Sequence, residues 1–193
     1  MSEFDDRKPP PDFAMLRAVE ILAQMHERVR HSPNTPPAPI DRPVVLHSER
    51  FAFAVGRTKR IDVERELGVA FSYPARGWHT YASKETKERC LLSAFYKSGI
   101  LVAVELYVPR GPHAPNLEGR DFGGFRLEPG GVHVGMLTNA IAQPFAPAVG
   151  GPGKVVYDSA FEARFPGGVA YAMAAKGVVE RLTIYADLSK SAA

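Results

Sequence analysis

The 193-residue chain is 45% hydrophobic and 23% charged, which is the composition of an ordinary folded protein with enough apolar material for a sizeable core. Its net charge of +3 is too small a basic excess to predict a nucleic-acid-binding surface. A single cysteine, Cys90, excludes an intrachain disulfide and a cysteine-rich zinc site, and no apolar run is long enough for a membrane-spanning helix.

The first part of the chain is predicted to be a tail followed by a helix. Residues 1–11 are polar and proline-rich, which is typical of a disordered tail, and they lack the apolar run of a secretory signal, so we expect a cytoplasmic location. Residues 12–31 are predicted to form an amphipathic helix, because Met15, Leu22 and Val29 recur at a spacing of seven. We expect the helix to pack on its own body or on a second copy in a homodimer. The alternative is a tethered helix that docks into a groove of a partner.

The remainder of the chain contains an internal repeat. After a proline-rich linker over residues 32–50, the segment 97–107 (KSGILVAVELY) returns as 176–185 (KGVVERLTIY), at a separation of 78 to 79 residues. We therefore divide the body into repeat 1, residues 51–110, and repeat 2, residues 111–193, which together form a single domain.

Each repeat is predicted to consist of one helix followed by antiparallel strands. The predicted elements of repeat 1 are a helix over 60–67 ended by Gly68, a strand over 78–81, and a hairpin of strands 90–96 and 100–108 around Ser98-Gly99. The predicted elements of repeat 2 are a helix over 135–145 and strands over 155–165, 169–175 and 178–187. The predicted fold class is α+β, with two tandem helix-plus-antiparallel-hairpin units sharing one sheet.

Alternation of side chains along the strands assigns the two faces of this sheet. We expect the helices to cover one face, which the pattern predicts to contain Leu91, Ser93, Phe95, Val102, Val104, Leu106, Leu182 and Ile184. The other face is predicted to present Glu105, Tyr107, Arg181, Thr183 and Tyr185 beside small alanines. Amphipathic tyrosines over small residues are typical of protein interfaces, so we predict that these five residues bind a protein partner. The alternative is that the N-terminal helix or a loop covers them.

Repeat 1 also resembles a known family. The segments Gly56-Arg57-Thr58, Val63-Glu64-Arg65-Glu66-Leu67-Gly68, Trp78-His79-Thr80-Tyr81 and Phe95-Tyr96-Lys97-Ser98-Gly99-Ile100-Leu101 look like the SmpA/OmlA outer-membrane lipoprotein domain. The resemblance covers about residues 56–108 and, less clearly, 131–187. Tandem copies of such a unit resemble the β-lactamase inhibitory protein fold, in which two units present one concave sheet to a protein partner. The resemblance implies this fold and a protein-binding role.

Chemical motifs are absent from the sequence. The six histidines have no metal-ligand spacing and are expected on the surface or in loops, and neither Gly150–Lys154 nor Asp121-Phe122-Gly123 has the surroundings of a nucleotide site. We therefore predict no catalytic residue, no metal and no cofactor. The predicted function is a non-enzymatic protein-interaction or scaffold module. The alternatives are a small-molecule or lipid binder with a pocket between sheet and helices, and, less favoured, an enzyme.

Overall fold

The computed structural model describes residues 13–37, 39–70, 77–82, 91–108, 122–148 and 157–188. It is an α+β fold built mainly of antiparallel strands, as predicted from the sequence. The predicted tail over residues 1–11 and Cys90 lie outside the described residues. Among the residues that are described, no helix is both long and apolar enough to cross a membrane.

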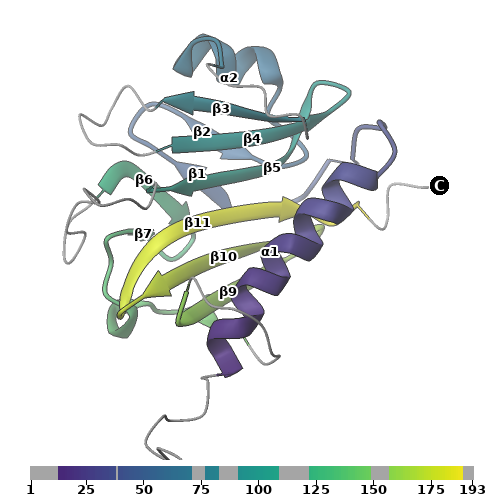
Figure 1. Ribbon diagram of the computed structural model, residues 1–193. Helices are drawn as coiled ribbons and strands as arrows, with labels where there is room; N and C mark the ends of the chain where they lie inside the picture. The colour runs from purple at the N-terminus through teal and green to yellow at the C-terminus, as the bar shows by residue number, and fades with distance from the viewer. Residues whose placement is uncertain are drawn as a thin grey trace, which may run out of the picture.

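The larger of two sheets has seven antiparallel strands in the order β3-β4-β5-β11-β10-β9-β8. These strands are β3 (Trp78–Ala82), β4 (Leu91–Lys97), β5 (Ile100–Tyr107), β8 (Ala146–Pro147), β9 (Ser159–Phe165), β10 (Gly168–Ala175) and β11 (Val178–Ala186). The two hairpins predicted from the repeat, β4–β5 and β10–β11, lie side by side because β5 pairs with β11. They form the centre of one continuous sheet (Figure 1).

A second, smaller sheet was not anticipated from the sequence. Its four strands run in the order β2-β1-β6-β7, with β1 at Val45–His47, β2 at Ala52–Ala54, β6 at Phe122–Glu128 and β7 at Val132–Val134. Leu46, Phe53 and Leu127 share its buried face, whereas His47 and Arg126 are exposed on the other. This alternation is the pattern of a sheet with one face in the core. β2 contacts β5 and β7 contacts β11, so the small sheet lies behind the large one in Figure 1.

The two central hairpins turn in the same way. Ser98 and Gly99 have φ values of 46° and 76°, and Lys176 and Gly177 have values of 52° and 75°. Two successive positive φ values are typical of the tight two-residue turn that matches the twist of antiparallel strands. Glycine at the second position adopts this conformation without a steric penalty, which explains why the sequence predicts both turns correctly.

A bulge close to each turn reverses the predicted assignment of faces. The pairing shifts by one residue between Phe95 and Tyr96 in β4, and between Met173 and Ala174 in β10. Beyond a shift of one residue, each side chain shares a sheet face with a different set of residues on the neighbouring strand than unbroken alternation predicts. The prediction that Leu91, Ser93 and Phe95 share a face with Val104 is therefore wrong, because Ser93 pairs with Glu105 and Phe95 with Ala103.

The N-terminal helix, α1 (Phe13–His31), forms a third layer. It crosses the large sheet in front of β9, β10 and β11 (Figure 1), and its own residues Leu22 and Val29 are buried. It lies on the face that contains Glu105, which its His26 contacts. The prediction that the helices cover the Val104 and Leu182 face is thus wrong for α1, and the small sheet packs there instead.

The proline-rich linker ties α1 to the body. Lys97 Nζ donates a hydrogen bond to the carbonyl oxygen of Ser32 at 2.7 Å, and the amide of Ser98 donates to Asn34 Oδ1 at 2.9 Å. Further along, Pro37 and Ile40 are buried, and Ile40 packs against the β9–β10 turn. The linker is therefore a strap across the end of the large sheet.

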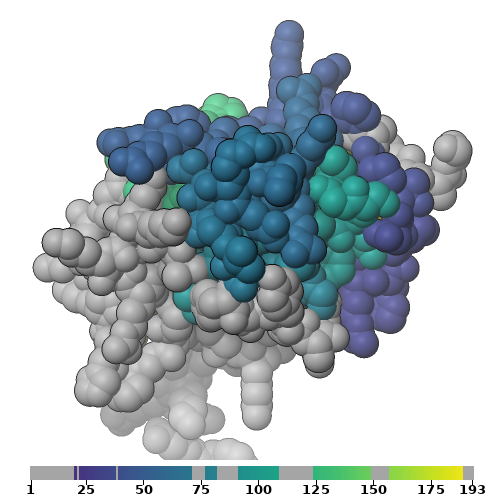
Figure 2. All heavy atoms as spheres, turned by 90° about the horizontal axis from the view of Figure 1, so that it is seen from above, coloured from purple at the N-terminus to yellow at the C-terminus, as the bar shows by residue number. Residues whose placement is uncertain are grey.

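The segments that follow the two hairpins of the small sheet, β1–β2 and β6–β7, differ. α2 (Arg60–Leu67) forms as predicted, buries Val63 and Leu67, and ends at Gly68 with φ of 87°. Figure 2, which looks down on this end of the molecule, shows α2 at the centre with α1 at its flank. The helix predicted over 135–145 is wrong: only a 3₁₀ turn, η1 (Thr138–Ala140), is present, and none of its residues is buried. The start of this segment pairs with the β10–β11 hairpin instead, since the amides of Gly135 and Thr138 donate to the carbonyl oxygens of Val179 and Gly177. Pro144 near its end has no amide hydrogen for a helical hydrogen bond.

Candidate functional site

Beneath α1, a row of polar side chains crosses the large sheet. Directly paired residues of neighbouring strands point to the same side of a sheet, so the pairing of six strands places six oxygen-bearing side chains in one line. This polar row consists of Thr80, Ser93, Glu105, Thr183, Tyr171 and Glu162. All but Glu162 are buried. Buried polar groups are costly unless they are hydrogen-bonded, so the row marks a place where the interior is not simply apolar.

Glu105 is the centre of the polar row. Its carboxylate accepts a hydrogen bond from His26 Nε2 of α1 at 2.5 Å and another from the Tyr185 hydroxyl, and Arg181 lies 3.7 Å away. Only 3% of the Glu105 side chain is exposed, whereas 38% of His26 is. The ring of His26 also packs on Trp78, with the ring centres 4.7 Å apart. The helix is thus held over the sheet by a buried carboxylate that has three polar partners.

Glu105, His26, Tyr185 and Arg181 together form the Glu105 cluster. The partners of Glu105 set its protonation state and that of Tyr185. Burial acts to raise the pKa of Glu105, but the hydrogen bond from His26 and the positive charge of Arg181 outweigh it, so the pKa lies below its ordinary value. Burial and the adjacent Glu105 carboxylate raise the pKa of Tyr185 well above its ordinary value. At neutral pH Glu105 is therefore ionised and Tyr185 is a neutral hydrogen-bond donor.

The structure brings together the five residues predicted to bind a partner, but most of them are covered. Tyr185, Thr183 and Glu105 are buried under the α1 layer, whereas Tyr107 and Arg181 are partly exposed. The Arg181 guanidinium carbon lies 4.6 Å from the centre of the Tyr107 ring. Among the described residues, the Thr183 hydroxyl and Arg181 Nε have no hydrogen-bond partner.

His26 is the member of the cluster that sequence reasoning missed, since all six histidines were expected on the surface or in loops. The spacing of the residues around His26 could have predicted that it faces the sheet. Leu22, Met25, His26 and Val29 follow the i, i+3, i+4, i+7 spacing of a single helix face, so His26 belongs to the stripe that faces the sheet. A histidine in a buried stripe needs a polar partner, and Glu105 supplies it.

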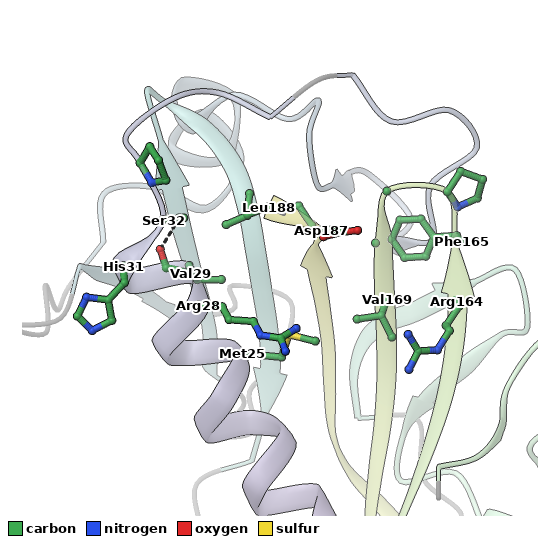
Figure 3. Close-up of a pocket in the computed structure, with 15 residues that line it drawn as sticks. Met25, Arg28, Val29, His31, Ser32, Arg164, Phe165, Val169, Asp187 and Leu188 are labelled. Atoms are coloured by element: carbon green, nitrogen blue, oxygen red, sulfur yellow. Dashed lines mark hydrogen bonds between the residues drawn. The ribbon is translucent and has the colours of Figure 1, made fainter. Parts of the chain in front are cut away.

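Beside this cluster, a cavity of about 810 Å³ opens between α1 and the ends of β9, β10 and β11 (Figure 3). Met25 and Val29 of α1 form one wall, and Phe165 and Val169 of the β9–β10 hairpin form the opposite wall. The start of the strap and Leu188, which follows β11, line the upper side. Val169 pairs with Tyr185, so the cavity borders the Glu105 cluster.

Charged side chains accompany the apolar walls of this cavity. Arg28 extends from α1 into the space in front of Val169, and Arg164 extends from β9 on the other side (Figure 3). Arg164 donates two hydrogen bonds of 3.2 Å to the carboxylate of Glu162. Asp187 lies at the rim. The sequence analysis assigned none of the cavity residues to a binding site, because they come from segments more than a hundred positions apart.

In the part of the chain that the structure describes, no group of three or more histidine, cysteine, aspartate or glutamate side chains could hold a metal ion. Comparisons of the chain with protein-family models, curated proteins and solved structures found no match.

Proposed function

We propose that this protein is a non-enzymatic binding protein that takes a small apolar or amphipathic molecule between α1 and the large sheet. The observation that carries the proposal is the cavity of about 810 Å³ walled by Met25, Val29, Phe165 and Val169. Ligand sites in proteins are typically about 300–1,000 Å³ and mostly apolar, with a few polar groups that fix orientation. The cavity has this size and this kind of lining.

The construction of the cavity also supports a binding role. One wall is a helix attached by the strap, and the opposite wall is a tight hairpin of the sheet, so a small movement of α1 would change the width of the space. The Glu105 contact to His26 and the Ser32 contact to Lys97 hold this helix at two points. A ligand that packs on both walls would add to these contacts and stabilise the folded state.

Filling the cavity should abolish binding. Met25→Trp places a large ring in the space, so we expect the affinity for the neutral fluorescent probe N-phenyl-1-naphthylamine to fall about tenfold or more, measured by fluorescence titration. Gln24→Trp is the matched control, because Gln24 is exposed on the same helix and does not line the cavity. The proposal fails if the unaltered protein shows no saturable binding, or if both variants bind as well as it does.

The second candidate is the protein-interaction module expected from the sequence. The partly exposed pair of Tyr107 and Arg181 favours it, because tyrosine and arginine are enriched among the residues that dominate the affinity of protein interfaces. Glu105, Thr183 and Tyr185 would take part only if α1 moved away, since they are buried in its presence.

For a second copy of the chain, or a protein that copurifies with it, Tyr107→Ala is expected to weaken association by about 1–3 kcal/mol. Sedimentation or calorimetric titration would measure the loss, and the melting temperature should change little. Ile61→Ala is the control, because Ile61 is 60% exposed on α2. Equal affinities of the two variants would remove Tyr107 from the interface.

We also propose that the body is a tandem repeat, which is the arrangement implied by the resemblance to SmpA/OmlA-like domains and the β-lactamase inhibitory protein fold. Two sets of backbone hydrogen bonds support it. Gly56 donates to Leu101 as Gly135 donates to Val179, and Arg60 donates to Gly99 as Thr138 donates to Gly177.

The pairing of the central strands gives further support to the repeat. Glu105 and Thr183 occupy equivalent positions of the repeated segment, and they pair directly with each other across β5 and β11. An approximate twofold axis between two copies of one unit would pass through such a pair. The polar row would then be centred on the junction of the two units.

A further inference from the structure

The charged residues in the lining of the cavity are mostly basic. They are Arg28, Arg164 and Asp187. Two of these are arginines and one is an aspartate, and Glu162, which lies outside the lining, is the partner of Arg164. His31, which also lines it, is engaged by Glu27 of the same helix at 2.8 Å. An apolar space with a basic mouth is complementary to an amphipathic anion.

Arg28 is the better placed of the two arginines. No hydrogen bond or ion pair is made by its side chain to another described residue, and this side chain extends over the cavity rather than along the helix (Figure 3). An arginine in the last turn of a helix also interacts favourably with the helix dipole, which is a structural explanation for its presence. Arg30 lies in the same turn without lining the cavity, so it offers a direct comparison.

Arg164 can turn toward a ligand at little cost. Its two hydrogen bonds to Glu162 join neighbouring side chains on one strand, and 72% of the arginine side chain is exposed. Exposed ion pairs contribute little to stability, so exchanging Glu162 for an anionic ligand would lose little. The planar guanidinium can donate two parallel hydrogen bonds to a carboxylate or phosphate.

We propose that the ligand of this cavity is an amphipathic anion, with an apolar chain between Met25 and Val169 and a carboxylate or phosphate head bound by Arg28 and Arg164. This inference rests on the proposed ligand-binding function and adds the chemical class of the ligand. Arg28 comes from the α1 wall of the cavity and Arg164 from the β9 wall, so the head lies between these two walls.

The test compares three compounds that share one apolar chain: octanol, octanoate and octyl phosphate. Each displaces N-phenyl-1-naphthylamine from the full-length protein in a fluorescence titration at low ionic strength. We expect at least one of the two anions to bind about fivefold more tightly than octanol, and Arg28→Gln to remove this advantage without changing the affinity for octanol. Arg30→Gln is the matched control and should keep the advantage.

The outcomes separate the inference from the function on which it rests. Equal affinities for octanol and both anions overturn the inference and leave the apolar cavity intact as a binding site. An equal loss in Arg28→Gln and Arg30→Gln also overturns it, because the effect would then come from the charge of the helix end. Failure of all three compounds and of the probe to bind overturns the proposed function itself. The anion whose affinity exceeds that of octanol by the larger factor identifies the head group.

Discussion

Replacing Glu105 with alanine is expected to lower the free energy of unfolding by about 3–5 kcal/mol, because the change leaves the mostly buried Arg181 charge without its partner. It also removes the acceptor for His26 and for the Tyr185 hydroxyl. Urea denaturation followed by circular dichroism would measure the loss. The large expected effect follows from burial, since a similar contact on the surface contributes at most about 1 kcal/mol.

Glu162→Ala is the matched control for this experiment. Glu162 lies in the same polar row, but its partner Arg164 is mostly exposed, so the expected loss is about 0–1 kcal/mol. Combining Glu105→Ala with Arg181→Met should cost less than the sum of the two single changes, since the residues interact directly. A loss for Glu105→Ala no greater than that of Glu162→Ala would contradict the central role of Glu105.

The contacts of Glu105 also predict how the stability of the protein depends on pH. The pKa of Glu105 is lower in the folded protein than its ordinary value of 4.5, so its ionised form stabilises the fold at neutral pH. This contribution is complete above the ordinary pKa and is lost as the pH falls through the lowered folded-state pKa. The difference in unfolding free energy between the original protein and Glu105→Gln should therefore shrink toward zero in strong acid.

The second large effect is expected in the core between the two sheets. Leu182 is fully buried on the face of the large sheet opposite α1, so Leu182→Ala should cost about 2–4 kcal/mol through lost burial and the cavity left behind. Denaturant melts would measure the change. Ile61→Ala, at an exposed position of α2, should alter stability by less than about 0.5 kcal/mol. A loss for Leu182→Ala as small as that of Ile61→Ala would mean that this face is not in the core.

Much of the local structure could be predicted from the sequence because it depends on neighbouring residues. Positive φ at Ser98-Gly99 and Lys176-Gly177 is favoured by the glycine of each pair, which fixes both central hairpins. Likewise, α2 ends at Gly68, as predicted from its freedom to adopt positive φ. The α+β class follows from these elements.

The face assignments could not be predicted, because they depend on bulges that strand patterns do not reveal. Val102 of β5 and Glu180 of β11 are skipped in the pairing with the neighbouring strand, and each of these unpaired residues reverses which side chains share a face across the hairpin. The absence of a full helix at η1 similarly reflects contacts with distant residues, since the amides of Gly135 and Thr138 donate to Val179 and Gly177.

The candidate site was partly visible in the sequence. Glu105, Thr183 and Tyr185 were recognised as a group because the repeat places them at related positions, and they do share one face. Their burial was decided by α1, whose His26 is 79 positions from Glu105 in the chain. The sequence determined the helices α1 and α2, the two central hairpins, and the shared face of Glu105, Thr183 and Tyr185. Only the tertiary structure decided which face is covered, because burial depends on which distant elements pack together rather than on local preference.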